Sequence, residues 1–207
     1  QMKYTFLLIS FFILNTTHAQ SIKDSIFKED IVTLVEEMEF MYGYDQMLRE
    51  YTLYQTFDKS DTDRIESLPD SLNVIEIEKR KFKSDSTVKF IWQKYISPKD
   101  IEHTERMIEI TEKYGFPSTK RIKMYYEEEF NDPEFNPYIL LIHAPKEYWN
   151  ELITLMKNEL DNNRISKCTY GHMLWHFTGR KSFQPMLDNG YEMVEENGKT
   201  ILKSTCK

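Results

Sequence analysis

Apolar residues recur at intervals of three and four residues along the segment from Asp30 to about Thr56. The repeat is carried by Ile31, Val35, Met38 and Tyr42. This spacing places the residues on one side of a helix, so it predicts a long amphipathic helix that begins at Ser25 or Asp30. The same steps then reach Asp45 and Arg49, which are therefore expected on the buried face of that helix.

Helical patterns cover most of the remaining chain. Helices are expected over 70–96 with a break at 84–86, and over 118–130, 145–161 and 166–177. Residues 58–71 and 131–137 are expected to be loops, because polar residues and proline dominate them. The apolar segment 138–142 fits either a strand or a buried helix, since periodicity cannot separate the two over so short a run.

Two boundaries in the middle of the chain are marked by residues with specific backbone roles. Ser97 can cap a helix, and Pro98 suits the first helical position. Gly115 is expected to end this helix after Tyr114 in a left-handed conformation, with Pro117 just beyond it. A helix is therefore predicted over 97–114.

The end of the chain has a different pattern. Strand-like runs on either side of Asn197-Gly198 predict a β-hairpin near residues 191–203, with a type I′ turn. The chain has only 6 glycines and 7 prolines, which favours long helices over a turn-rich β fold. The predicted fold class is mainly α: residues 20–207 form a single helical domain with a small C-terminal β-hairpin.

The first residues have the order of a secretory signal peptide. Lys3 gives a basic start, an apolar run of about eleven residues ends at Leu14, and the small residue Ala19 closes a short polar stretch. A spanning helix needs about 20 apolar residues, so cleavage near Ala19 is expected rather than anchoring. We expect residues 1–19 to be a signal peptide and the mature protein to be periplasmic or secreted, in or beyond a bacterial envelope, without a membrane span.

Charge and cysteine content narrow the class of protein further. Acidic residues outnumber basic ones by 34 to 27, for a net charge of −7, or about −8 once Lys3 leaves with the signal peptide. This balance argues against nucleic acid as a partner, because nucleic acids call for basic patches. Cys168 and Cys206, the only cysteines of the chain, either pair in an oxidising compartment or stay free.

Asp45 and Arg49 are the best candidates for chemistry. A carboxylate on a buried helix face needs a partner, and Arg49 lies one turn away and can supply it. Packing of segment 138–142 on the same helix face would bring His143 to Asp45, so Gln46 and His143 complete a candidate polar site. The alternative is an ion pair that stabilises the fold and binds nothing.

His172 and His176 are weaker candidates. They are four residues apart on a predicted helix and share a face, which suits two ligands of one zinc ion. However, Met173 stands where the metalloprotease pattern has Glu, and a third ligand would have to come from His143 or Glu102. Packing among the neighbouring aromatic residues is the favoured alternative, so no metal and no other cofactor is predicted.

The remaining charged residues have ordinary explanations. Arg180, also a weaker candidate, either binds an anionic ligand or interacts with the negative end of its helix. His103 is expected on the exposed side of its helix, and the acidic run 127–129 is expected to be a solvated face.

The chain resembles an uncharacterised bacterial family, a domain of unknown function. Its members show Asp-Gln-x-x-Arg on an early helix, a Tyr-Gly-Trp-Pro-like turn and an apolar run that ends in His. The counterparts here are Asp45-Gln46-Met47-Leu48-Arg49, Tyr114-Gly115-Phe116-Pro117 and Leu140-Leu141-Ile142-His143-Ala144. The similarity covers residues 31–165. The family's later Asp-Arg is replaced by Trp175-His176 or Gly179-Arg180, and its Tyr-Gly-Thr-Gln segment is absent. The family has no assigned activity, so the resemblance implies none.

Two functions are compatible with these patterns. The first is a non-enzymatic module that binds an unknown small polar ligand or a protein through Asp45, Gln46, Arg49 and His143. The alternative is a hydrolase in which His143 is the general base, a role that histidine suits at neutral pH. In that case Asp45 orients His143 or holds a metal together with the histidine pair. No nucleophile is identifiable, which places the enzyme second.

Overall fold

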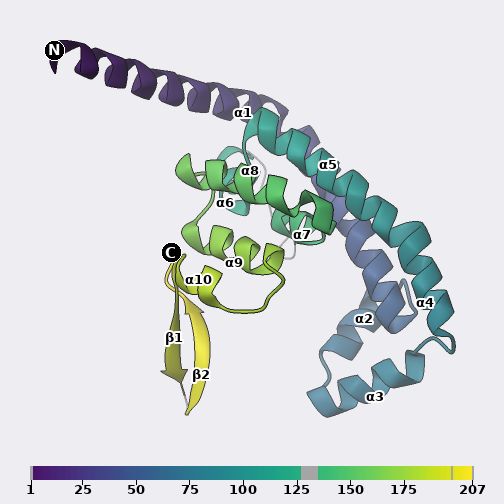
Figure 1. Ribbon diagram of the computed structural model, residues 1–207. Helices are drawn as coiled ribbons and strands as arrows, with labels where there is room; N and C mark the ends of the chain where they lie inside the picture. The colour runs from purple at the N-terminus through teal and green to yellow at the C-terminus, as the bar shows by residue number, and fades with distance from the viewer. Residues whose placement is uncertain (1, 127–134, 197, 207) are drawn as a thin grey trace.

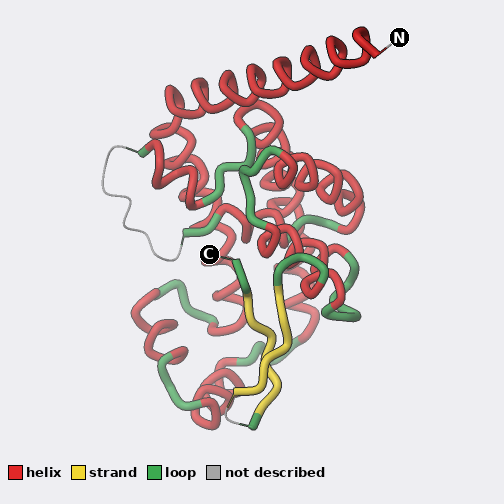
Figure 2. Tube along the Cα trace, turned by 90° about the vertical axis from the view of Figure 1, so that its left-hand side faces the viewer, coloured by secondary structure: helices red, strands yellow, loops and turns green. Residues whose placement is uncertain are grey.

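The computed structural model describes residues 2–126, 135–196 and 198–206, with side chains from residue 22 onward. Its longest element is α1 (Met2–Tyr54), and the first part of this helix extends alone beyond the rest of the fold in Figures 1 and 2. The expected start at Ser25 or Asp30 is wrong. No glycine or proline occurs before Gly43, so nothing in the chain interrupts the helix there.

Three short helices follow α1 and form an arm, which we call the α2–α4 arm. They are α2 (Lys59–Glu66), α3 (Asp70–Arg80) and α4 (Asp85–Ile91). The loop expected over 58–71 is wrong, because Asp58 caps α2 by accepting a hydrogen bond from the backbone of Ser60 and Ile65 is fully buried. In contrast, α3 and α4 bury none of their residues.

Helix α5 (Ser97–Tyr114) is joined to α4 without a break through a π-helical turn (Trp92–Ile96). The predicted bounds of this helix, 97–114, are confirmed, but Ser97 continues a helical run and does not cap a free helix start. The N–H of Ser97 donates to the carbonyl of Trp92, the spacing of a π turn, and this wider turn precedes Pro98, which has no N–H to give. The helix ends at Gly115 as expected, but with φ 76° and ψ 157°, which is an extended and not a left-handed helical conformation.

The body of the fold consists of α1, α5 and four further helices. These are α6 (Thr119–Tyr125), α7 (Pro137–Ile142), α8 (Trp149–Asp161), which follows a 3₁₀ turn (Lys146–Tyr148), and α9 (Lys167–Phe177). The ambiguous segment 138–142 is helical, because Asn136 caps it and Pro137 occupies its first turn. The acidic run 127–129 and most of the loop expected over 131–137 lie outside the described residues.

Helix α5 runs back along α1, as Figure 1 shows. Polar contacts fix this antiparallel order: Tyr114 donates to Asp30, and Arg106 to Glu37. The core lies where these two helices meet α7 and α8. Its fully buried side chains include Phe27, Met38, Met107, Ile110, Leu140, Leu141 and Leu152. The α1 face that supplies part of this core continues directly to Asp45.

The C-terminal hairpin is confirmed. A short helix that the sequence did not predict, α10 (Gln184–Leu187), leads to β1 (Tyr191–Glu196), which pairs with β2 (Lys199–Ser204) in antiparallel register. Gly198 has the positive φ of 73° that the expected turn needs, whereas its partner in the turn, Asn197, lies outside the described residues. A disulfide between Cys168 and Cys206 ties the hairpin to α9. None of the described helices combines the length and apolarity needed to cross a membrane.

Candidate functional site

A buried polar cluster lies where the apolar face of α1 ends. Asp45 is only 4% exposed there. Arg49 donates from Nε to Oδ1 of Asp45 at 2.9 Å, and Gln46 donates from Nε2 to Oδ2 at 2.7 Å. His143, just after α7, has its Nδ1 2.9 Å from Oδ2 of Asp45. The predicted meeting of Asp45, Arg49 and His143 in space is therefore confirmed, and Gln46 joins them.

Arg49 has a second carboxylate partner that the sequence analysis did not select. Its Nη2 donates to Oδ1 of Asp100, in the first turn of α5. The ring of Trp92 lies 5.1 Å from the guanidinium carbon, a cation–π distance. Two carboxylates and an aromatic face therefore hold the guanidinium in place, and its hydrogen bonds are directed at the protein itself.

His103 is buried, so its expected position on an exposed face is wrong. It is 7% exposed, and the ring of Tyr44 packs perpendicular to it at 6.4 Å between centroids. Its Nδ1 is a buried atom without a hydrogen-bond partner among the described residues. Asp100 and His103 follow Ile96 at helical spacing on the buried face of α5. The periodicity argument that found Asp45 would have found both residues.

The two carboxylates that share Arg49 are perturbed in opposite directions. Burial favours protonation of Asp45, but the hydrogen bond and charge of His143 and the charge of Arg49 together outweigh it, so the pKa of Asp45 is lowered. For Asp100 burial dominates over the opposing effect of Arg49, and its pKa is raised. Burial also lowers the pKa of His103. Environments that separate the pKa values of neighbouring acids are a common feature of sites that handle protons.

His143 is the most exposed ionisable member of the cluster, with 23% of its side chain accessible, against 3% for Asp45. The carboxylate at Nδ1 favours the tautomer that carries the proton there, and this leaves the lone pair on Nε2. Nε2 has no hydrogen-bond partner among the described residues. The cluster can therefore accept a hydrogen bond or a proton from an outside molecule at this atom.

The weaker candidates His172 and His176 lie on α9 and are engaged by their neighbours. His172 stacks between Tyr138 and Trp175, with centroids 5.3 and 5.6 Å away, and its Nδ1 is 2.6 Å from the Tyr138 hydroxyl. His176 Nδ1 is 2.9 Å from Nη2 of Arg180. Burial, and then the charge of Arg180, lower the pKa of His176 to about 4. These contacts agree with the aromatic packing favoured from the sequence.

Both residues considered as a third metal ligand for His172 and His176 are engaged elsewhere. His143 is bonded to Asp45, and the carboxylate of Glu102 pairs with Lys99. Across residues 2–126, 135–196 and 198–206, no group of three or more histidine, cysteine, aspartate or glutamate residues could hold a metal ion.

Comparisons with known proteins add no family to this description. No protein-family model matches the chain, and neither a curated protein nor a solved structure does. The function has to be inferred from the chemistry of the residues themselves.

Proposed function

We propose that this protein is an exported binding module that takes up a small polar ligand at the exposed edge of His143. The observation that carries the proposal is the Asp45 bond to Nδ1, which leaves Nε2 as the remaining acceptor of an imidazole whose side chain is 23% exposed. A ligand for this edge presents a hydrogen-bond donor, such as a hydroxyl or an ammonium group. Two carboxylates against the one guanidinium of Arg49 give the cluster excess negative charge, which favours such a donor over an anion.

The resemblance to the uncharacterised family also bears on this proposal. Asp45, Gln46, Arg49 and His143 carry that resemblance, and they belong to one hydrogen-bonded network. Asp45, Gln46 and Arg49 are neighbours on one helix, but His143 lies 98 positions from Asp45 along the chain and still contacts it. Their contact supports a common role for the network, although the family suggests no ligand.

A titration followed by ¹⁵N NMR of the imidazoles tests the binding proposal. Ethanolamine and glycerol serve as donor-bearing probes, and acetate serves as a probe without a strong donor. We expect the donor probes to shift Nε2 of His143 and to lose this effect in His143→Gln. The control variant His172→Gln, on α9, should bind the probes like the unmodified protein. Donor probes that leave His143 unaffected, or that bind equally well to His143→Gln, would count against the proposal.

The same geometry favours one second candidate, a hydrolase. Asp45 would orient His143 and stabilise its imidazolium after Nε2 removes a proton from water. Water would be the nucleophile, because no hydroxyl or thiol of the described residues is bonded to Nε2. Turnover of 4-nitrophenyl acetate or 4-nitrophenyl phosphate that is lost in both His143→Gln and Asp45→Asn would favour this candidate. Stoichiometric zinc in the purified protein would favour its metal-assisted version.

Export is the other part of the proposal. The disulfide between Cys168 and Cys206 suits an oxidising compartment, and residues 2–19 carry the order of a signal peptide. Mass spectrometry of protein secreted by its host should therefore show an N-terminus at or near Gln20. An intact N-terminus at Met2 in the envelope fraction would contradict this part alone.

A further inference from the structure

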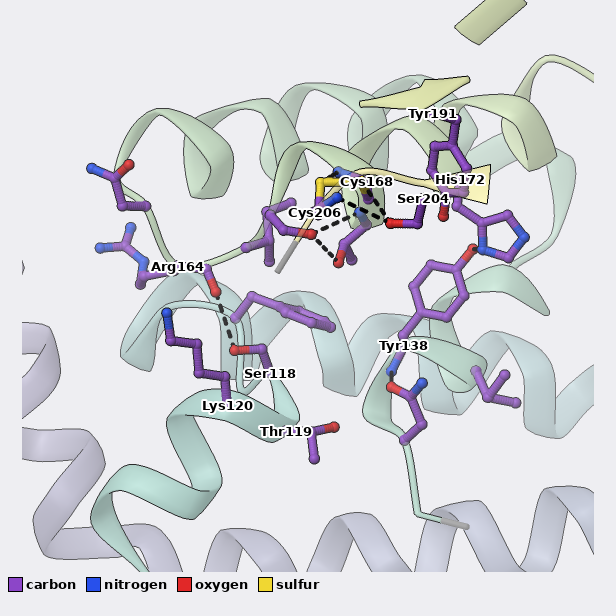
Figure 3. A pocket seen from close by; sticks show the side chains of 17 residues that line it. Ser118, Thr119, Lys120, Tyr138, Arg164, Cys168, His172, Tyr191, Ser204 and Cys206 are labelled. Atoms are coloured by element: carbon purple, nitrogen blue, oxygen red, sulfur yellow. Dashed lines mark hydrogen bonds between the residues drawn. A yellow bond between two sulfur atoms is a disulfide. The ribbon is translucent and has the colours of Figure 1, made fainter. Parts of the chain in front are cut away.

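A cavity of about 800 Å³ lies at the opposite end of α7 from His143. Figure 3 shows its walls, which come from the starts of α6, α7 and α9 and from the base of the hairpin. Tyr138, in the first turn of α7, lines the cavity, whereas His143 follows the last turn of the same helix. The volume lies in the range of sites for small organic molecules.

The charged groups of the cavity wall are all basic. None of the described lining residues is an aspartate or glutamate, in a chain that has 34 of them. Lys120 and Arg164 both line the cavity. The charge of Arg164 is matched by Glu159, which is not part of the lining, whereas Lys120 forms no ion pair with any described residue. The unmatched charge at the cavity is therefore positive.

The rest of the wall combines hydroxyl groups with apolar surface. Hydroxyls come from Ser118, Thr119, Ser166, Thr169 and Ser204, and these groups can serve ligands of either polarity. Phe116 and Ile139 give the wall an apolar side. Because the hydroxyls are indifferent to the sign of charge, Lys120 decides which charge the cavity prefers.

The hairpin side of the wall is held by the disulfide. Cys168 and Cys206 both line the cavity, together with Tyr191 and Ser204 at the base of the hairpin. Gly190 packs against the bridge so closely that an added Cβ would lie 3.0 Å from either sulfur. Reduction would release the covalent tie between this wall and α9, so the shape of the cavity depends on the oxidised cysteines.

We infer that this cavity binds a small organic anion, a molecule that carries a carboxylate beside an apolar ring or chain. The carboxylate faces Lys120, and the ring lies on the apolar side formed by Phe116 and Ile139. This preference is the reverse of the one proposed for His143, where donors are favoured. The two binding proposals are therefore independent, and the failure of one does not affect the other.

Isothermal titration with benzoate and benzamide tests the inference, because the two probes share a shape and differ in charge. We expect benzoate to bind saturably and benzamide to bind more weakly, by up to about fivefold, the effect of one partly exposed ion pair. Lys120→Ala should remove this preference. The control is Lys123→Ala, which changes an exposed lysine on the same helix outside the cavity lining and should leave the preference unchanged.

A second pair of measurements examines the wall. Dithiothreitol, which is uncharged, and the variant Cys206→Ser should both weaken benzoate binding while the far-ultraviolet circular dichroism of the helices is kept.

Equal binding of benzoate and benzamide would overturn the inference. So would an absence of saturable binding, or an equal loss in Lys120→Ala and Lys123→Ala, which would mean non-specific attraction to surface charge. Benzoate binding that is unchanged by reduction would contradict the part assigned to the hairpin.

Discussion

Two buried clusters in this molecule each pair an arginine with a carboxylate, and they differ in whether all of their polar atoms have hydrogen-bond partners. In one, Arg164 donates from Nε and Nη2 to both oxygens of Glu159, and the backbone N–H of Phe116 donates to the same carboxylate. Side-chain exposure is 6% for Arg164 and 2% for Glu159. Every oxygen of this carboxylate is engaged by the protein, and for this reason we call the cluster closed.

The Asp45 cluster also pairs an arginine with a buried carboxylate, but it is open at two atoms. Nε2 of His143 has no partner among the described residues and belongs to a partly exposed ring, and Nδ1 of His103 is buried without a partner there. Closed networks of this kind stabilise and fix a fold, whereas open ones have capacity for a ligand or a proton.

The closed cluster should give the largest loss of stability. Replacing Glu159 with Gln leaves the guanidinium of Arg164 buried without its counter-charge, so we expect the free energy of unfolding to fall by about 3–5 kcal/mol. Denaturation in urea measures the loss. Asp161→Asn, which breaks an exposed pair with Lys157 on the same helix, is the control and should cost less than about 1 kcal/mol. Similar losses in the two variants would contradict the closed character of the cluster.

The open cluster should lose less when its carboxylate is neutralised. In Asp45→Asn, Arg49 keeps Asp100 as a partner and His143 can turn to water, so we expect a loss of about 1–3 kcal/mol. The tautomer of His143, read from its ¹⁵N shifts, should change in the same variant because Asp45 no longer fixes Nδ1.

The control for this variant is Glu37→Gln. It breaks a partly exposed pair with Arg106 between the same two helices and should cost less than about 1 kcal/mol. If Asp45→Asn destabilises the protein as much as Glu159→Gln does, the Asp45 cluster is a structural triad and the comparison between the two clusters fails.

A glycine lies beside each cluster, and the two should respond to alanine in opposite directions. Gly115 has φ 76°, and a Cβ there would lie 2.4 Å from Cδ of Arg164, so Gly115→Ala should cost about 1–3 kcal/mol. Gly43, two residues before Asp45, is exposed, and an added Cβ would meet nothing within 4 Å. Gly43→Ala should therefore gain about 0.5–1 kcal/mol, because it improves helix propensity. A loss of stability in Gly43→Ala would show that this position has a contact role.

Periodicity alone predicted the central part of the Asp45 cluster. The three- and four-residue steps along α1 placed Asp45 and Arg49 on the buried face, and the apolar run ending in His143 supplied the segment that packs there. The same steps along α5 select Asp100, but this residue was passed over because an acid in the first turn of a helix already has an ordinary explanation. His103 was misplaced for a related reason, since a histidine among charged neighbours resembles an exposed residue until the partner helix is known.

Local signals predicted the hairpin and several helix ends, but not the features that depend on distant parts of the chain. Asn197-Gly198 and Gly115 act through their own backbone, so the sequence near them is sufficient. The cavity beside Lys120 joins residues from 116 to 206, and no local pattern contains such a set. The π turn at 92–96 was not predicted either. Ser97-Pro98 has the composition of a helix start whether or not a helix precedes it.

Stability should also depend on pH, with an effect smaller than those above. Burial lowers the pKa of three histidines: His103 on α5, and His172 and His176 on α9. Below their ordinary pKa of 6.5 the unfolded chain binds more protons than the native protein, so stability falls as the pH decreases. For His176 this loss runs from about pH 6.5 to about pH 4, where its native pKa lies.

The thermal unfolding midpoint, measured in steps from pH 7 to pH 4, should decline in the unmodified protein and decline less in His103→Gln. The charged groups around His103 are Asp45, Glu102, Lys99 and Arg49, and burial outweighs the two carboxylates that favour its charged form. Asp45 adds its own loss only below its ordinary pKa of 3.8, because its native pKa is lowered. Asp100 acts in the opposite sense, since a raised native pKa makes the folded state the better proton acceptor.

The variant His176→Gln isolates the contribution of α9 to the decline in the unfolding midpoint. If His103→Gln keeps the full decline while His176→Gln removes it, the acid sensitivity belongs to α9 and the unpartnered Nδ1 of His103 has no part in it.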